Sequence, residues 1–256
     1  MRPVALVIAA ALTAVVLLPA GPARPASRSI DVPVLMYHRV GSLPPDPPAM
    51  LAQLTVQPRV FAAQMRWLAR HHFQAITPRQ LFDALEKRKR LPARPVLITF
   101  DDGYRNVRFN AAPVLHRLGM PATAFVITGR LDGADPSFLT WRDVRALERD
   151  GFTIGSHTVH HIPLSSASPA QATRELTRSR ATLERHLGHP VEWFAYPYGS
   201  TSAAVVTLVH KSGYLLAFTT QKGATQYTRA PLLLSRYEIA RNDRLADFAA
   251  LLNSRR

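Results

Sequence analysis

Residues 96–104 read Val96-Leu97-Ile98-Thr99-Phe100-Asp101-Asp102-Gly103-Tyr104, an apolar run that leads directly into two carboxylates and a glycine. The run is typical of a strand buried on both faces of a parallel sheet, and the glycine permits a tight turn at its end. Proteins with α/β folds build their sites at the carboxyl ends of such strands. The stretch therefore predicts an α/β fold with both carboxylates at its site, although a solvated surface turn would have the same sequence.

The segments around this strand alternate between strand and helix patterns. Further strands are expected at residues 32–37, 73–77, 122–128, 152–157, 191–195, 214–219 and 232–239. Helical patterns separate most of these strands, and such alternation predicts a parallel sheet with helices packed against it. Because the chain holds about seven or eight strand-helix units, we expect a closed barrel rather than an open sheet.

The composition fits a single domain with a sizeable core. The chain has 256 residues, 47% of them hydrophobic, and contains no cysteine. The lack of cysteine excludes disulfides, thiolate metal sites and a cysteine nucleophile. An oxidising compartment would therefore pose no problem for the chain.

The first 26 residues have the pattern of an export signal. Met1-Arg2-Pro3 precedes an uncharged run over 4–18, and small or helix-breaking residues follow at 19–23. This order is typical of a secretory signal, and the run is shorter than the roughly 20 apolar residues of a membrane span. We expect residues 1–26 to be a signal peptide or an N-terminal anchor. The protein would then be periplasmic, secreted or attached to the membrane.

The chain is strongly basic, with a formal net charge of +15 at pH 7. A positive field favours anionic partners, which for an exported protein include an anionic envelope surface. Nucleic acid is the other partner that charge alone would suggest. The export pattern argues against it, so we expect no nucleic-acid partner.

Three predicted strands end in residues that can do chemistry. Asp101-Asp102, His157 and the segment Tyr196-Pro197-Tyr198 each follow a strand, and such ends converge on one face of a parallel barrel. Two imidazoles and one carboxylate form an open zinc or iron site. His157 and His161 share a face if their segment turns helically, and Asp102 would supply the carboxylate. The alternative is a polar loop with unrelated histidines.

Two further side chains could move protons at such a site. A metal ion polarises a carbonyl and acidifies water, and Asp101 could accept the proton that the water loses. His38 follows the strand expected at 32–37 and is a candidate general acid. An ordinary histidine at a strand end fits His38 equally well. His160 faces away from its neighbours in the pattern and is expected to take no part.

Three motifs in this order resemble the polysaccharide deacetylase family, also called the NodB-homology domain or carbohydrate esterase family four. They are Thr99-Phe100-Asp101-Asp102-Gly103, His157-Thr158-Val159-His160-His161 and Tyr196-Pro197-Tyr198-Gly199. The resemblance covers residues 94–256, and residues 27–93, with a Pro-rich loop, would form the N-terminal part of the barrel. It implies a distorted (β/α) barrel in a single domain and metal-dependent hydrolysis of an N-acetyl group.

The resemblance also implies roles for individual residues. Asp101 is similar to the family's catalytic base, and Tyr198 to the residue whose backbone N–H helps hold the oxyanion. The triad of Asp102, His157 and His161 is similar to the ligands of one divalent metal ion, for which zinc is expected.

The sequence departs from the common family pattern in two places. Many members carry an arginine just before the proline of the third motif, whereas this chain has Ala195-Tyr196-Pro197; Arg236 could supply the missing charge. Many members also carry a late Leu-x-His that provides the general acid, and this chain has none. Residues 33–38 resemble the start of exported poly-N-acetylglucosamine deacetylases, in which His38 would take the acid role. Trp141 is similar to a family tryptophan that lines the pocket, although a core position fits it equally.

The sequence therefore predicts an exported polysaccharide deacetylase that acts on a polymer or oligomer of N-acetylglucosamine. An O-acetyl esterase or a cyclic-amide hydrolase on the same fold is an alternative. A non-catalytic glycan-binding protein is a rival from another class. Intact Asp101, Asp102, His157 and His161 argue against that rival, because a dead site should lose at least one of them.

Overall fold

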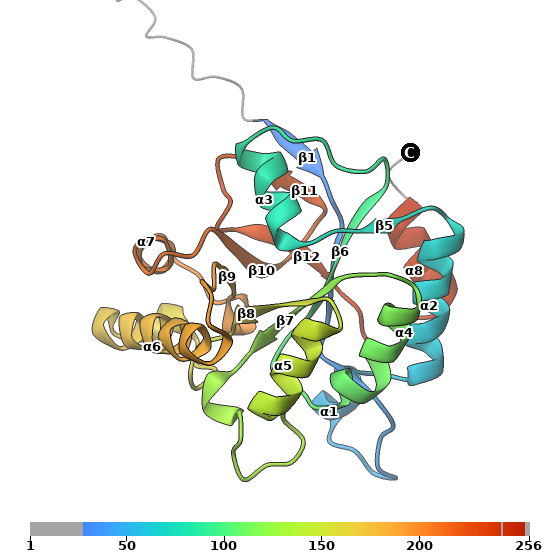
Figure 1. Cartoon of the computed structure of the whole chain (residues 1–256), viewed down its shortest axis with the longest axis horizontal. Coiled ribbons are helices and arrows are strands. Elements are labelled where there is room, and N and C mark those ends of the chain that lie inside the picture. Colours follow the sequence, from blue (N-terminus) through green and yellow to red (C-terminus); the bar gives the residue numbers. More distant parts are fainter. Residues whose placement is uncertain (1–27, 242, 254–256) are drawn as a thin grey trace, which may run out of the picture.

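The computed structural model describes residues 28–241 and 243–253 of the chain (Figure 1). The predicted signal segment at residues 1–26 lies outside this part. None of the helices in the described part is long and apolar enough to cross a membrane.

Seven parallel strands of the described chain close into a barrel. Their order around it is β2, β6, β7, β8, β9, β10 and β12, and β2 closes the ring because it pairs with both β6 and β12. The strands are β2 (Val34–Tyr37), β6 (Pro95–Phe100), β7 (Ala122–Val126), β8 (Phe152–Ser156), β9 (Trp193–Ala195), β10 (Leu216–Lys222) and β12 (Leu234–Glu238). The expected distorted (β/α) barrel is confirmed, and it is one domain in which residues 34–37 supply a strand.

Short strands outside the ring were not predicted, except β5. β5 (Gln74–Ala75) pairs with the amino-terminal end of β6. β1 (Ser29–Asp31) pairs antiparallel with β11 (Thr225–Tyr227), and β3 (Arg39–Val40) pairs with β4 (Thr55–Val56). Pairs of two or three residues are too short to give a periodic pattern.

Helices surround the barrel, with α2 beside α8 on one flank and α6 beside α7 on another (Figure 1). Thr77 and Thr140 form capping boxes at the starts of α3 and α5, and prolines open α2, α3 and α6, as expected for these residues at helix starts. The helices are α1 (Ala49–Gln53), α2 (Pro58–Arg70), α3 (Pro78–Glu86), α4 (Ala112–Arg117), α5 (Trp141–Arg149), α6 (Pro169–Leu187), α7 (Ala203–Lys211) and α8 (Leu245–Asn253).

One helix differs from expectation at its start. The sequence predicts a regular helix from the Asp101 turn to Leu118, whereas the structure has a π-helix, η1 (Val107–Ala111), that leads into α4. Pro113 has no backbone N–H to donate. This is tolerated in the first turn of α4, where an N–H would have no partner within the helix, but not in the interior of one long regular helix. Short 3₁₀ turns follow β7, β8 and β9: η2 (Thr128–Arg130), η3 (Leu164–Ser166) and η4 (Pro197–Gly199).

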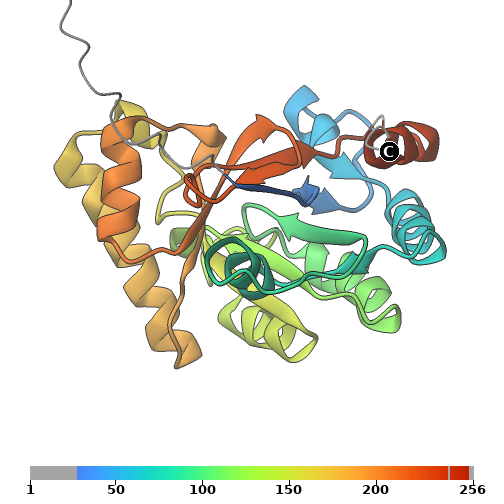
Figure 2. The same cartoon turned by 90° about the horizontal axis from the view of Figure 1, so that it is seen from above.

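The core has an outer layer and an inner layer. Residues such as Leu35, Ile98 and Phe100 face the helices, whereas their strand neighbours Val34 and Leu97 belong to a separate cluster inside the barrel. This inner cluster continues into α3, which covers the amino-terminal end of the strands (Figure 2). With that end covered, the carboxyl ends remain open for a site.

Inside the barrel, the aromatic ring of Phe125 needs a glycine on the neighbouring strand. Gly155 of β8 lies directly opposite Phe125 of β7 in the strand register. A Cβ atom added at Gly155 would lie 2.5 Å from the Phe125 ring and 3.0 Å from the Trp193 carbonyl oxygen. Glycine at 155 therefore makes room for the phenylalanine.

We predict that Gly155→Ala destabilises the fold by roughly 1–3 kcal/mol, the usual cost of overpacking a filled core. Chemical unfolding measures this cost. Phe125→Leu in the same chain should relieve part of it, so the double variant should be more stable than the sum of the single changes implies. Strictly additive losses would show that the two positions do not compete for space.

Candidate active site

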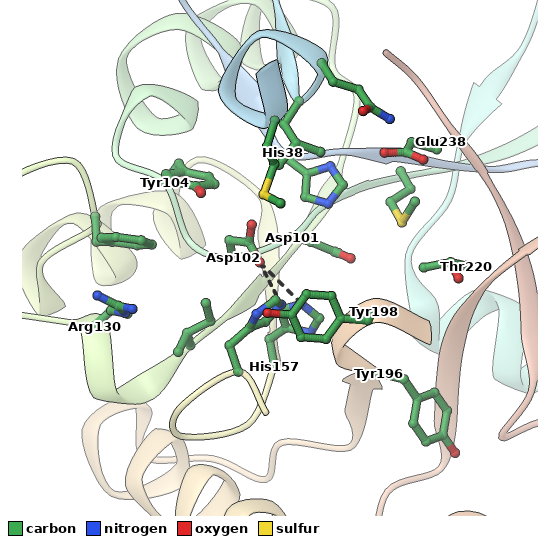
Figure 3. Close-up of a pocket in the computed structure, with 17 residues that line it drawn as sticks. His38, Asp101, Asp102, Tyr104, Arg130, His157, Tyr196, Tyr198, Thr220 and Glu238 are labelled. Atoms are coloured by element: carbon green, nitrogen blue, oxygen red, sulfur yellow. Dashed lines mark ion pairs between the residues drawn. The ribbon is translucent and has the colours of Figure 1, made fainter. Parts of the chain in front are cut away.

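A cavity of about 380 Å³ opens at the carboxyl ends of the barrel strands. His38, Asp101, Asp102, His157 and Tyr198 all line it (Figure 3). They follow β2, β6, β8 and β9, and parallel strands bring such positions to one face of a barrel. The structure thus brings together residues that lie up to 160 positions apart in the sequence.

Asp102 lies between two histidines. Its Oδ1 atom is 3.4 Å from Nε2 of His157 and 3.3 Å from Nε2 of His161. One ligand atom from each of these three side chains lies within 4.8 Å of the other two. The predicted triad is therefore assembled, and its atoms face a common point.

The hydrogen bonds of His157 and Asp102 favour a cation in the space between the three side chains of the triad. Nδ1 of His157 lies 2.8 Å from the Ala195 carbonyl oxygen, which can only accept, so Nδ1 carries the proton. In the neutral ring Nε2 is then an acceptor, and it faces another acceptor, Oδ1 of Asp102. That oxygen is buried and has no hydrogen-bond partner among the described residues. A cation between these atoms satisfies all three side chains, which is the arrangement that metal-ligating histidines need.

The pKa values of Asp102 and His161 are shifted toward the forms that bind a cation, whereas that of His157 is shifted the other way by the two carboxylates. Burial alone would raise the pKa of Asp102, but the nearby imidazole of His157, together with His38 and His161, outweighs burial and lowers this pKa to about 2. Burial would lower the pKa of His157, yet Asp102 and Asp101 hold it above the usual value. Burial, followed by the charge of His157, lowers the pKa of His161 to about 4. Asp102 is thus ionised and His161 neutral at neutral pH, the states in which both bind metals.

The backbone is strained where these side chains are presented. Asp102, Thr158, His161 and Tyr198 all have positive φ angles, of 72°, 66°, 58° and 57°. Such angles are uncommon outside glycine and are outliers for a β-branched residue such as Thr158. They persist only where surrounding contacts fix them, and they cluster at functional sites.

The histidine loop is held by a residue that the sequence did not reveal. Glu175 of α6 is buried, and its Oε2 accepts the backbone N–H groups of Val159 and His160, each at 2.9 Å. Its Oε1 lies 2.7 Å from Nδ1 of His160. Glu175 thus fixes the loop that carries His157 and His161. No motif marks it, because it lies in the middle of a polar helix.

Asp101 has a partner of its own. Arg236 donates from both terminal nitrogens to its two carboxylate oxygens, at 2.8 and 2.6 Å. The guanidinium is buried and also donates from Nε to the Thr219 carbonyl oxygen at 2.8 Å. Arg236 therefore lies where the sequence placed the missing charge, although it comes from β12 and not from the third motif.

This pair keeps Asp101 ionised without a metal. Burial would raise the pKa of Asp101, but the charges of Arg236 and His157 outweigh it, and the pKa is lowered. Asp101 and Asp102 are adjacent, yet one binds a guanidinium and the other faces two imidazoles. The two adjacent carboxylates therefore have different environments.

His38 follows β2 and extends into the cavity near both carboxylates (Figure 3). Its Nδ1 atom is buried and has no hydrogen-bond partner among the described residues. The charge of His38 also lowers the pKa of Asp101 and of Asp102. His38 is thus close enough to the carboxylates to act at the same substrate.

The ring of Tyr198 packs against His161, with 4.5 Å between the ring centres. Tyr198 is 64% exposed, so its ring forms part of the rim of the cavity. Tyr196 points away, as its hydroxyl donates to the Leu232 carbonyl oxygen at 2.9 Å (Figure 3). Tyr196 thus lines the cavity, but its hydroxyl is engaged elsewhere.

Two charged lining residues were missed in the sequence. Glu238 ends β12 and lies at one side of the cavity, and Arg130 lies at the other side after β7 (Figure 3). Arg130 follows the strand predicted at 122–128, so the rule that located Asp101 could also have found it. Glu238 lies inside the strand predicted at 232–239, whose end falls at Glu238 in the structure. The structure also shows where His160 and Trp141 lie relative to the cavity. His160 bonds Glu175 outside the cavity, and Trp141 packs in the outer core against His186.

Comparisons with known proteins agree with this fold and identify a family. The family profile described as "Polysaccharide deacetylase" matches residues 88–217. The YxkH protein of Bacillus subtilis (strain 168) is 30% identical over 223 residues, which cover 87% of this chain and 76% of that protein. The solved structure of the Streptococcus pyogenes deacetylase PplD, in complex with acetate, has a TM-score of 0.82 at 26% identity and covers 88% of this chain and 100% of that one.

A relative from Staphylococcus aureus (strain MSSA476) has a more specific name, "Poly-beta-1,6-N-acetyl-D-glucosamine N-deacetylase". It is 26% identical over 176 residues, which span 64% of this chain and 60% of the staphylococcal protein. The profile match covers half of this chain, and the match to YxkH extends over most of both proteins. The chain therefore belongs to the polysaccharide deacetylase family of hydrolases.

Proposed function

We propose that this protein removes N-acetyl groups from a polysaccharide that contains N-acetylglucosamine, and that it needs a divalent metal ion to do so. The observation that carries the proposal is the unpartnered Oδ1 of Asp102, which faces Nε2 of both His157 and His161. The name of the staphylococcal relative supports the substrate class.

The donor set fits one divalent ion held by Asp102, His157 and His161. Two imidazoles and one carboxylate leave coordination positions open and suit zinc, which is the metal we propose. When bound, such an ion polarises the acetyl carbonyl and acidifies water. Glu175 and the Ala195 carbonyl oxygen hold the two histidines in place for it.

Asp101 is proposed as the general base. Its pKa is lowered, so it is ionised at neutral pH and can accept the proton of the attacking water. The bidentate contact with Arg236 fixes the orientation of the carboxylate. Arg236 is thus a positioning residue that acts through Asp101.

The remaining steps concern the oxyanion and the leaving amine. The backbone N–H of Tyr198 is proposed to donate to the oxygen on which negative charge develops, as preorganised donors do in acyl transfer. His38 is proposed to protonate the leaving nitrogen. An amine anion leaves poorly, so an amide needs this proton more than an ester does.

The site of action is proposed from the sequence. The export pattern at residues 1–26 would deliver the protein to the cell envelope, where glycan substrates occur. The net charge of +15 would favour contact with an anionic envelope surface.

One experiment tests the function as a whole. Purified protein is incubated with peptidoglycan, chitin oligomers or β-1,6-linked N-acetylglucosamine oligomers, with and without a chelator, and both acetate and free amine are measured. Equal release of acetate and amine that stops with chelator is expected. Acetate without amine would indicate an O-acetyl esterase, and neither product would contradict the proposal.

We predict that His161→Ala loses most of its bound metal, because it removes one of three protein ligands. His160→Ala is the matched control, since His160 lies in the same loop but bonds Glu175 outside the cavity. Metal content after dialysis measures both. Retention of a full equivalent by His161→Ala would contradict the triad.

We predict that Asp101→Asn keeps the metal ion and loses at least a hundredfold in kcat, as removal of a general base does. Asparagine can accept only one of the two hydrogen bonds from Arg236 and leaves the buried guanidinium without a counter-charge, so thermal unfolding should show a folded protein with a lower melting temperature. If metal and activity disappear together in a folded variant, Asp101 is a ligand and the assignment is wrong.

We predict that His38→Gln slows N-deacetylation by about 10²–10⁴-fold, the usual contribution of a positioned acid. Hydrolysis of an activated acetyl ester should slow much less, because its leaving group needs little protonation. Steady-state kinetics on both substrates measures the difference. Equal losses on amide and ester would indicate a binding or structural role instead.

A further inference from the structure

We propose that a second, shallow hollow beside the active-site cavity binds the neighbouring sugars of the same glycan chain. This inference rests on the proposed function and adds a subsite to it. The hollow has a volume of about 330 Å³ and is lined by Arg39, Arg105, Asn106, Phe109, Asn110, Pro136 and Ser137. None of these residues belongs to the three motifs or lines the first cavity.

The two hollows share a wall of stacked rings. Tyr104 and Phe138 line the first cavity, and their rings stack with 4.9 Å between centres and 22° between planes. Arg105 and Ser137, which follow and precede them in the chain, line the second hollow. The backbone N–H of Arg105 donates to the Ser137 carbonyl oxygen at 2.7 Å. A chain that leaves the first cavity over this wall therefore enters the second.

The wall carries a guanidinium at each end. Arg39 lies over the Tyr104 ring at 4.5 Å, and Arg130 lies over the Phe138 ring at 5.3 Å. Neither arginine has a carboxylate within ion-pair distance among the described residues, in contrast to Arg105, which binds Asp143. Arg130 lines the first cavity and Arg39 the second. Hydrogen bonds from Ser137 and the charges of both arginines lower the pKa of the exposed Asp135, but each hollow has a guanidinium without a direct ion pair among the described residues.

The second hollow offers an apolar face as well as donors. Phe109 is 58% exposed, one of the most exposed large apolar side chains of the described chain. An aromatic face with a few polar groups around it is typical of small-molecule sites, and it suits the C–H face of a pyranose ring. The guanidinium of Arg39 lies over Tyr104 and can donate from its remaining N–H groups to sugar hydroxyls or to acetamido carbonyl oxygens.

The floor of the hollow is rigid. Asn106 accepts from the Val40 N–H at 3.2 Å, and Asn110 donates to the Val40 carbonyl oxygen at 2.7 Å. These amides are therefore engaged by the protein and hold η1 against β3. A preformed surface loses little entropy when a ligand binds.

A subsite of this kind predicts that longer chains are better substrates. Binding energy from sugars that do not react can be used to position the one that does. The test compares kcat and KM for N-acetylglucosamine oligomers of two to six sugars, in β-1,6 and β-1,4 linkage, using the full metal-loaded protein. The quantity of interest is the ratio of kcat/KM between the hexamer and the dimer.

Phe109→Ala and Arg39→Gln should each lower this ratio about tenfold, mainly by raising KM for the hexamer. Tyr227→Ala is the matched control. Tyr227 is also exposed, at 44%, with Arg229 over its ring at 5.6 Å, but it lies on β11 and lines neither hollow. This control should keep the wild-type ratio.

The outcomes separate the subsite from the function. A wild-type ratio near one, or a ratio that Phe109→Ala and Arg39→Gln leave intact, would overturn the subsite while the deacetylase activity stands. An equal fall in the Tyr227→Ala control would also overturn it, because the effect would then not belong to this hollow. If no oligomer releases amine with any variant or with the wild type, the proposed function itself fails.

Discussion

The buried ion pair between Arg236 and Asp101 is the interaction on which the site depends. It crosses the barrel interior from β12 to the end of β6 and satisfies both oxygens of Asp101. Breaking a buried pair of this kind leaves an uncompensated charge and is strongly destabilising. Because Asp101 is satisfied by the protein, the neighbouring Asp102 is the carboxylate left for a cation. The two adjacent carboxylates therefore have different partners, a guanidinium for Asp101 and two imidazoles for Asp102.

The strand that closes the barrel also positions His38 in the site. β2 comes from the N-terminal part of the chain and lies between β12 and β6. Its carboxyl end delivers His38 to the cavity that Asp101 and Asp102 already line. The same closure lets the Arg236 side chain of β12 reach Asp101 across the barrel interior, so one topological feature supplies both the partner of Asp101 and the candidate acid.

The sequence predicted the parts of this molecule that follow from local pattern. Buried strands such as 96–100 read as apolar runs, and the strand-end rule located Asp101, Asp102, His157 and His38. It could not predict Glu175, which lies on a polar helix and acts only because α6 packs beside the histidine loop. The π-helix η1 and the pairing of β3 with β4 also depend on tertiary contacts. Arg236 was expected to supply the charge for Asp101, but its bidentate contact across 135 positions is visible only in the structure.

The central claim is that Asp102, His157 and His161 hold one divalent ion between them. The most direct test is a crystal structure of the zinc-loaded protein with anomalous data collected on both sides of the zinc absorption edge. The account predicts a single strong anomalous peak between Oδ1 of Asp102 and Nε2 of both histidines, with Asp101 still bound to Arg236. A site without a peak, or a peak bound by Asp101 in place of Asp102, would contradict it.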